Sequence, residues 1–238
     1  MTFHTTRWSL VLRAGGEDAE ARGALDELCA SYWPPVYALY RREGLDVEAA
    51  RDLTQSLFAE LLARGDVARA SPEKGRFRAY LRTCARNLLA NHRDAERAQK
   101  RGGGRAPLSL DVDGEEARLL REPIDALDAA AVFERRWAQA VIESALTRLE
   151  RDEARAGREA QFFALRPTLD GDANAKPYAA LAEDLGTSEG ALKVAVHRLR
   201  ARFKDALLVE VRETLPDGDE PGAELRELLA AFGPRRSA

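Results

Sequence analysis

The chain has 238 residues and a net charge of −3, and 45% of its residues are apolar and 32% charged. This length allows two modest domains, and no apolar run reaches the about 18 residues that indicate a membrane span. Strong helix formers dominate and β-branched runs are nearly absent, which predicts an all-α protein. No signal-peptide pattern precedes Cys29 and Cys84, which are expected to be reduced thiols of a cytoplasmic protein.

Charge is unevenly distributed along the chain. Residues 75–105 carry nine Lys and Arg against two acids, whereas residues 106–160 carry thirteen acids against eight bases. Residues 188–207 carry five bases against two acids, and residues 208–238 carry four bases against seven acids. Such segregation predicts local polyanion-binding sites rather than a generally basic body.

The first half of the chain predicts one helical domain. Helical periodicity fills residues 23–63 and resumes from Phe77 to about Arg101, after a break that contains Gly and Pro. We expect this domain to cover residues 1–105. The Gly-rich and then acidic segment that follows predicts a flexible linker over residues 106–129.

The second half predicts a helix-turn-helix domain over residues 130–210. A short helix is closed by Gly186, and Thr187 or Ser188 caps a longer basic helix. The C-terminal extension, residues 211–238, holds one further helix. That helix either extends the preceding domain or folds back, onto the acidic linker side or onto a basic helix, and restrains DNA binding.

The basic helix after the turn has one face suited to duplex DNA. Its expected buried stripe consists of Leu192, Val196, Leu199 and Phe203. On the opposite side lie Gly190, Val194, His197 and Ala201, flanked by Lys193, Lys204, Arg198 and Arg202. Small residues between cations suit a helix that enters a groove and clamps phosphates, although a solvated amphipathic hairpin has the same periodicity.

The helix over 77–101 carries a second basic face. We call cationic rail the residues that line up on it: Arg82, Arg86, Arg93, Arg97 and Lys100. The side expected to be buried consists of Phe77, Tyr80, Cys84, Leu88 and Ala95. Such a rail can follow a phosphate backbone, and Asn87 and Asn91 offer amide donors and acceptors beside it. The alternative is a solvated basic face.

No motif predicts catalysis, a metal or a cofactor. The acidic segments 111–122 and 170–174 lack the glycine that the sixth position of a calcium loop needs. The three histidines show no metal-ligand spacing with the cysteines, and no acid–base or nucleophile arrangement is present. We therefore expect no enzyme, no metal and no cofactor. Trp8, Trp33 and Trp137 are expected to anchor cores.

Three motifs in order resemble bacterial RNA polymerase sigma factors of the extracytoplasmic-function (ECF) type. They are DLTQSLFAELL (52–62), FRAYLRTCARNLLANHR (77–93) and YAALAEDLGTSEGALKVAVHRLRARF (178–203). The resemblance implies a region-two-like helical bundle and a region-four-like helix-turn-helix domain. The implied partners are core RNA polymerase, through its beta-prime clamp helices and beta flap, and promoter DNA, both duplex and single-stranded. An anti-sigma factor is a further candidate partner. The implied location is the cytoplasm, at the nucleoid when in holoenzyme.

The resemblance also implies roles for individual residues. The residues implied to bind polymerase are Asp52, Leu53, Gln55 and Phe58. Capture of the −10 element falls to Tyr80, Arg82, Cys84, Ala85, Arg86, Asn87, Asn91, Arg93 and Arg97, with Cys84 and Ala85 in the wall of a base pocket. Reading of the −35 element falls to Ser188, Gly190, Lys193, Val194, His197, Arg198 and Arg202.

Three functions remain open at this point. The first is a transcription initiation factor that reads the −35 duplex and melts the −10 region. The second is a non-initiating helix-turn-helix regulator, in which the cationic rail is incidental. The third is a helical interaction protein that binds no DNA. A carboxylate and a phenylalanine six residues apart, such as Asp52 and Phe58, are also compatible with ordinary surface and core positions.

Overall fold

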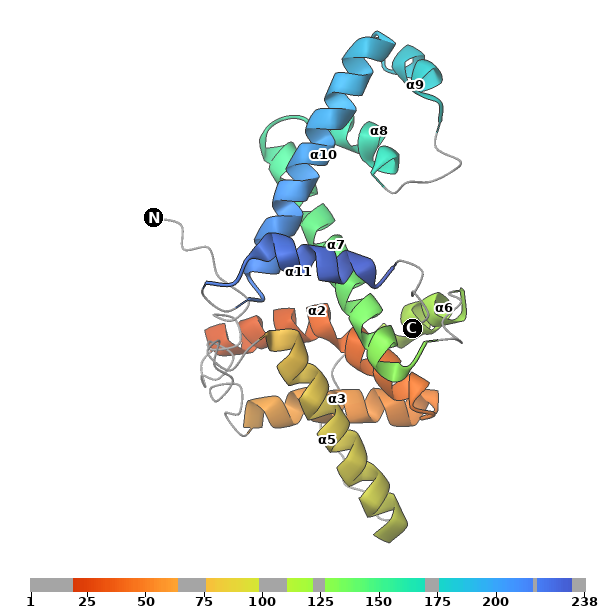
Figure 1. Cartoon of the computed structure of the whole chain (residues 1–238), viewed down its shortest axis with the longest axis vertical. Helices are drawn as coiled ribbons and strands as arrows, with labels where there is room; N and C mark the ends of the chain where they lie inside the picture. The colour runs from red at the N-terminus through yellow and green to blue at the C-terminus, as the bar shows by residue number, and fades with distance from the viewer. Residues whose placement is uncertain are drawn as a thin grey trace. The chain divides into compact units, whose positions relative to one another are not determined.

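The computed structural model describes residues 19–63, 76–98, 111–121, 127–169, 176–215 and 218–232. Within these ranges the secondary structure consists of α-helices and one short 3-10 helix, without strands, which confirms the all-α class (Figure 1). None of the described helices is long and apolar enough to cross a membrane.

The chain divides into two compact units. The first contains residues 1–140 together with residues 211–238, and the second contains residues 141–210. The divisions fall within α7 (Ala129–Arg155) and α10 (Glu189–Arg212), so each of these helices contributes to both units.

Three long helices come first among the described residues of the first unit. They are α2 (Ala19–Arg42), α3 (Val47–Ala63) and α5 (Phe77–Ala98). The helical periodicity over 23–63 is thus split between α2 and α3, because Gly44 adopts a φ of 94° that a residue with a side chain rarely takes. The Leu45 N–H then donates to the Tyr40 carbonyl oxygen at 3.2 Å, which closes α2.

Aromatic rings form the centre of the first unit. The ring of Tyr32 stacks on Trp137 at a centroid distance of 4.2 Å, and the edge of Phe77 meets Tyr32 at 5.4 Å. Trp33 and Trp137 are buried, as predicted for core anchors, and Trp8 lies outside the described residues.

Because Trp137 lies on α7, the first turns of this helix belong to the first unit. The boundary that we expected at residue 130 therefore differs from the division of the structure, which follows residue 140. Hydrophobic periodicity runs unbroken through α7 and cannot show at which point a continuous helix changes neighbours.

The segment expected to be a flexible acidic linker, 106–129, contains a helix. This helix is α6 (Val112–Arg121), and the expectation of a flexible linker is wrong for it. Its Glu115 is buried and forms an ion pair with the buried Arg136 of α7, with Nε and Oε1 2.9 Å apart. The acids of this segment therefore take part in packing the first unit.

The second unit contains the end of α7, most of α10 and three short elements. These are α8 (Glu159–Leu165), a 3-10 turn (Arg166–Thr168) and α9 (Tyr178–Asp184). On α10, Leu192, Val196 and Leu199 are buried as predicted, whereas Phe203 is only half-buried.

The predicted turn between α9 and α10 is present. Gly186 adopts a φ of 59°, and the Thr187 N–H donates to the Ala182 carbonyl oxygen at 2.9 Å, which ends α9. The Ser188 Oγ accepts the Ala191 N–H at 3.2 Å, so Ser188 rather than Thr187 caps α10. The short helix, tight turn and long helix of the helix-turn-helix layout therefore follow one another in the second unit.

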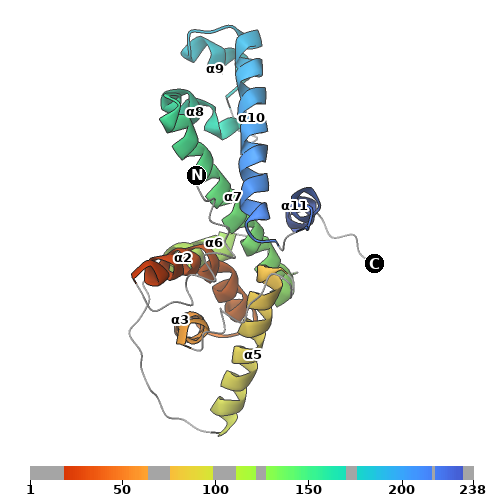
Figure 2. The ribbon, with the colours of Figure 1, turned by 90° about the vertical axis from the view of Figure 1, so that its left-hand side faces the viewer.

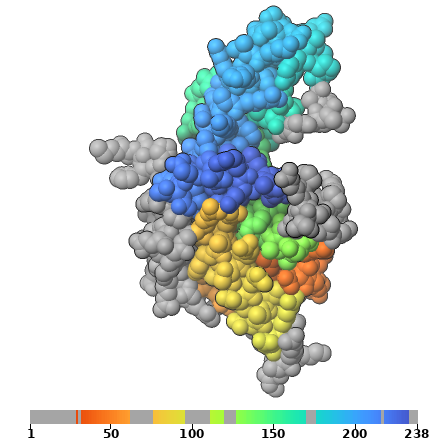
Figure 3. All heavy atoms as spheres, viewed as in Figure 1, coloured from red at the N-terminus to blue at the C-terminus, as the bar shows by residue number. Residues whose placement is uncertain are grey.

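The C-terminal extension forms α11 (Pro221–Ala230), which belongs to the first unit. It lies across the beginning of α5 (Figure 1, Figure 2), and the space-filling view shows the two in contact (Figure 3). Leu225 and Leu228 are buried, whereas Leu229 is exposed. We expected this helix either to extend the helix-turn-helix domain or to fold back. In the structure it is folded back onto α5, a basic helix.

Candidate nucleic-acid interface

The helix α5 turns a different side to the core than we expected. Its buried side chains recur every four residues and are Phe77, Leu81, Ala85 and Leu89. Of the side chains that we expected to be buried, Tyr80, Cys84 and Leu88 are half-buried and Ala95 is exposed. Phe77 belongs to both stripes and the other positions move by one residue, so the buried side is rotated by somewhat less than the roughly 100° that separates neighbouring residues in an α-helix. This rotation places the half-buried residues at the edge of the core.

A pocket of about 180 Å³ lies at this edge, between α3 and α5. The first of these helices lines it with Leu57, Glu60 and Leu61, and the second with Tyr80, Cys84, Asn87, Leu88 and Asn91. Four predicted −10 residues therefore line one cavity: Tyr80, Cys84, Asn87 and Asn91. Apolar and aromatic walls with two amide groups suit an unstacked base, whose faces are apolar and whose edge carries donors and acceptors.

Two residues differ from the predicted pocket. Ala85 is fully buried, and its carbonyl oxygen accepts the Tyr40 hydroxyl at 3.1 Å, so Ala85 is not part of the wall. Glu60 lines the pocket although the sequence did not point to it. An ionised carboxylate offers only acceptors, which complements the amino group of a base. No signal in the sequence marked Glu60, because its place depends on how α3 meets α5.

Of the three members of the cationic rail whose side chains are described, two are paired with acids. Arg82 forms an ion pair with Glu134 of α7 at 2.6 Å, and Arg93 forms one with Glu43 at 3.0 Å. Arg86 is exposed, and within the described residues no ion pair involves it. The side chain of Arg97, like Lys100, lies outside the description.

Two further arginines extend the rail at its N-terminal end. Arg78 lies one turn before Arg82, so the same four-residue spacing identifies it in the sequence, and Arg76 immediately precedes α5. Both make ion pairs with Glu224 and Glu227 of α11. The rail predicted from the sequence began at Arg82, one turn too late to include either residue.

The predicted polymerase-binding residues of α3 divide between surface and core. The side chain of Asp52 is 71% exposed, and Gln55 is half-buried. Leu53 and Phe58 are buried, with 6% and 0% exposure, so the structure contradicts a surface role for them. Phe58 lies six residues after Asp52, which places the two side chains about 120° apart on a helix of 3.6 residues per turn.

The predicted −35 face of α10 is open to solvent. Its exposed members are Ser188, Gly190, Lys193, Val194, His197 and Arg198. The Lys193 ammonium contacts the Glu189 carboxylate at 2.7 Å, and this hydrogen bond raises the pKa of Lys193. The lysine therefore stays cationic at neutral pH.

Arg202 differs from the other members of this face. It is half-buried, and its Nε lies 2.6 Å from Oε1 of the buried Glu153. Arg158 binds the other oxygen of Glu153 at 2.7 Å, and hydrogen bonds from Arg158 and then charge from Arg202 lower the pKa of this carboxyl. Arg202 thus neutralises a buried carboxylate, which corrects its assignment to the free DNA-contacting edge.

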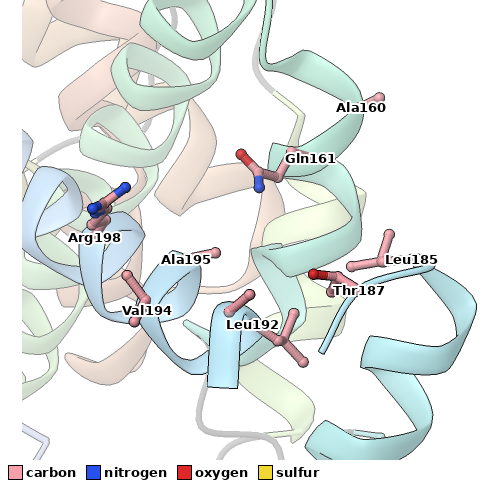
Figure 4. Close-up of a pocket in the computed structure, with 9 residues that line it drawn as sticks. Ala160, Gln161, Leu185, Thr187, Leu192, Val194, Ala195 and Arg198 are labelled. Carbon is pink, nitrogen blue, oxygen red and sulfur yellow. The ribbon is translucent and has the colours of Figure 1, made fainter. Parts of the chain in front are cut away.

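A larger hollow of about 600 Å³ lies beside the −35 face in the second unit (Figure 4). Its lining comes from α8, from the turn before α10 and from α10 itself: Ala160, Gln161, Leu185, Thr187, Ala191, Leu192, Val194, Ala195 and Arg198. Val194 and Arg198, two of the predicted −35 residues, therefore border a concave surface.

The described residues contain no group of three or more His, Cys, Asp or Glu side chains placed to hold a metal ion. The first acidic segment dismissed as a calcium loop begins at Asp111, which instead accepts the Gly114 N–H at 3.2 Å at the start of α6. The second, residues 170–174, lies entirely outside the description.

These features define an all-helical chain with two separate basic faces, one of them beside a pocket that suits a base. Residues 28–99, which include most of α2 and all of α3 and α5, match the family model of sigma-70 region 2. Region 2 domains of sigma factors bind core RNA polymerase and promoter DNA, and sigma factors are in general not enzymes. No curated protein and no solved structure is significantly similar to the chain. The match supports a sigma factor.

Proposed function

We propose that the chain is a transcription initiation factor of the ECF type, active in the cytoplasm and at the nucleoid when in holoenzyme. It binds core RNA polymerase, reads the −35 duplex with α10 and melts the −10 element with α5. It makes and breaks no covalent bond. Its work is to exchange binding free energy for the opening of base pairs.

The observation that carries this proposal is the pocket between α3 and α5. It lies inside the segment that matches sigma-70 region 2, and it brings together Tyr80, Cys84, Asn87 and Asn91. A captured base needs apolar faces and edge contacts, and its strand needs cations nearby. Exposed Arg86 lies next in sequence to Asn87 and supplies one such cation.

Polymerase binding is assigned to the exposed side of α3, with Asp52 and Gln55 as contacts and the beta-prime clamp helices as partner. In the second unit, Lys193, His197 and Arg198 are assigned to the −35 major groove. Small Gly190 between charged neighbours allows close approach to the duplex, since open space surrounds it. The beta flap and an anti-sigma factor complete the proposed partners.

The decisive experiment adds the purified chain to core RNA polymerase with a library of genomic DNA and maps the start sites of the transcripts. The proposal predicts start sites that appear only when the chain is present. If the chain binds duplex DNA but directs no transcript, it is the non-initiating regulator. If it binds neither DNA nor polymerase, it is an interaction protein.

A variant then tests the role of the pocket on a promoter found in this way. Arg86→Ala combined with Asn87→Ala removes one cation and one base-edge contact, each expected to contribute about 1–3 kcal/mol. We expect the permanganate reactivity of −10 thymines to fall at least about tenfold, whereas duplex binding is unchanged. Arg151→Ala, an exposed arginine on α7, is the matched control. Undiminished opening in the double variant contradicts the melting role of α5.

A further inference from the structure

We propose that Arg76, Arg78 and Arg82 form a binding site for the phosphate backbone of the melted DNA strand, and that α11 of the same chain occupies the part of this site formed by Arg76 and Arg78. The inference rests on the proposed function, because it assumes that α5 holds single-stranded DNA. It assigns to the C-terminal helix the role of an internal competitor that DNA has to displace.

The contacts between α11 and the arginines form one network, in which Arg78 also pairs with Glu134 of α7. Arg76 lies 2.8 Å from a Glu224 oxygen and also contacts Glu227. Arg78 lies 2.9 Å from Glu224 and 2.8 Å from Glu227. Each guanidinium therefore contacts both carboxylates. The two glutamates are three residues apart, so both lie on the same face of α11.

This arrangement resembles the way in which arginines hold phosphates. Guanidinium groups bind carboxylates and phosphates with the same planar fork of N–H donors. A row of carboxylates along one helix face can therefore occupy a row of phosphate sites. Arg82 completes the row one turn further along α5, where it is paired with Glu134 of α7 at 2.6 Å.

The burial of Glu224 indicates that its ion pairs with Arg76 and Arg78 stabilise the fold less than an apolar contact at the same place would. Its side chain is 1% exposed, and burial raises the pKa of this carboxyl against the opposing effect of Arg78 and Arg76. Buried ion pairs of this kind often contribute less to stability than an apolar contact of the same size. The more exposed Glu227 has a lowered pKa, chiefly through its hydrogen bond from Arg76.

The length of α11 allows its release. It has 10 residues, and an isolated helix of that length is marginal in water. Two buried leucines, Leu225 and Leu228, hold it against the first unit together with the charged network. A polyanion that binds the arginines in place of Glu224 and Glu227 removes the electrostatic part of this attachment and leaves the apolar part, which includes the two leucines.

Release of α11 also lengthens the surface available to DNA. Arg78, Arg82 and Arg86 follow one another at four-residue intervals, so they form one stripe on α5. In the structure the first two are neutralised by acids and the third is exposed. Release of α11 therefore removes two acids from Arg76 and Arg78, at the N-terminal end of this stripe, whereas Glu134 of α7 stays paired with Arg78 and Arg82.

The test measures binding of the full chain, without polymerase, to fluorescein-labelled oligothymidylate by fluorescence anisotropy. Glu224→Gln combined with Glu227→Gln keeps the shape and hydrogen bonding of α11 but removes its charge. We expect the affinity to rise about tenfold and the plot of log K against log salt to steepen by about 1.4, because each additional phosphate contact adds about 0.7 for a single strand. Unchanged affinity and slope overturn the inference.

Two further variants separate a specific effect from a general change in charge. Glu48→Gln combined with Glu220→Gln removes two exposed acids from the first unit and is expected to change neither quantity. Arg76→Gln and Arg78→Gln, added to the Glu224 and Glu227 variant, are expected to return the affinity to the wild-type value. If the affinity stays high in this quadruple variant, the arginines are not the site and the inference is wrong.

Hydrogen exchange of the wild-type chain gives an independent readout. We expect the amides of α11 to lose protection when oligothymidylate is added, while those of α3 keep theirs. Unchanged protection of α11 at saturating oligonucleotide overturns the inference even if the variants bind more tightly. Failure of this inference does not contradict the proposed function, because the chain can direct transcription by core polymerase whether or not α11 competes with DNA.

Discussion

Glu116 connects α6 to α2 through a compact hydrogen-bonded cluster. One of its oxygens accepts the Arg41 Nε at 2.6 Å and the Tyr37 hydroxyl at 2.8 Å. The other accepts Arg41 Nη2 at 3.1 Å. The hydrogen bond from Arg41 is the main cause that lowers the pKa of Glu116, whereas burial and then Glu116 raise the pKa of Tyr37.

Glu116→Gln is expected to lower the free energy of unfolding by about 1–2 kcal/mol at pH 7, because it removes charge-assisted hydrogen bonds from a partly exposed site. The pKa of Glu116 lies below its ordinary value of 4.5 in the folded state. The stabilisation is therefore present above pH 4.5 and disappears as the pH falls through the lowered pKa. Urea unfolding of wild type and variant at pH 7, 5, 4 and 3 (about one-unit steps over the titration range of a carboxyl) measures the difference.

Exposed Glu48→Gln serves as the control and is expected to change the free energy of unfolding by less than about 0.5 kcal/mol. A difference between wild type and Glu116→Gln that persists undiminished at the lowest pH contradicts the role of the ionised carboxylate.

At the scale of single residues, the sequence predicted which side chains share a site better than it predicted which side chains are exposed. Four of the predicted pocket residues do line one cavity, because they share the same region of α5. Phe58 and Ala85 were assigned to surfaces but are buried. Residue type and spacing define a helical stripe, but the rotation of that stripe toward the core depends on the neighbouring helices, which the sequence of one helix does not contain.

At the scale of elements, α10 combines two different kinds of cation. Lys193 and Arg198 are exposed on the face that we assign to duplex DNA, whereas Arg202 pairs with buried Glu153. The sequence predicted the helix, its preceding turn and its buried stripe. It did not identify the partner of Arg202, because Glu153 lies on α7 about fifty residues earlier.

Lys193→Ala combined with Arg198→Ala is expected to weaken binding to a −35 duplex and to reduce the slope of log K against log salt by about 1.8, since each phosphate contact contributes about 0.9 for duplex DNA. Anisotropy titrations over a range of salt concentrations measure both quantities. Arg151→Ala combined with Arg155→Ala removes two exposed arginines of α7 and is the matched control. An equal change in both double variants indicates a non-specific effect of charge and contradicts the assignment.

At the scale of the whole chain, acidic and basic stretches that are separate in sequence meet within the first unit. Glu134 from the acidic region pairs with Arg78 and Arg82, and glutamates from the C-terminal extension pair with Arg76 and Arg78. The sequence showed the segregation of charge and predicted polyanion sites from it. It did not show that the protein's own acids occupy part of the basic surface, because that depends on long-range packing.

The division of the chain also predicts which fragments fold. A fragment that ends at residue 105 lacks Trp137, whose loss from a core is expected to cost about 3–5 kcal/mol, a large part of a typical total of about 5–15 kcal/mol. We expect urea unfolding of fragment 1–105, followed by circular dichroism, to be broad or to have a much lower midpoint than that of fragment 1–140. Both fragments lack α11, so the comparison isolates α6 and the start of α7. Equal midpoints contradict the assignment of Trp137 to the first core.

Residues 211–238 belong to the first unit, which limits how the second unit can be exchanged by engineering or by recombination. The second unit is an internal insert rather than a tail, so it cannot be exchanged through a single junction. A graft of another helix-turn-helix needs two joints, one after Ala140 and one before Val211, and both interrupt continuous helices. Recombination at the Gly-rich stretch around residue 103, the obvious place for a crossover in the sequence, would instead separate the segment that matches sigma-70 region 2 from Trp137, which packs in the same core.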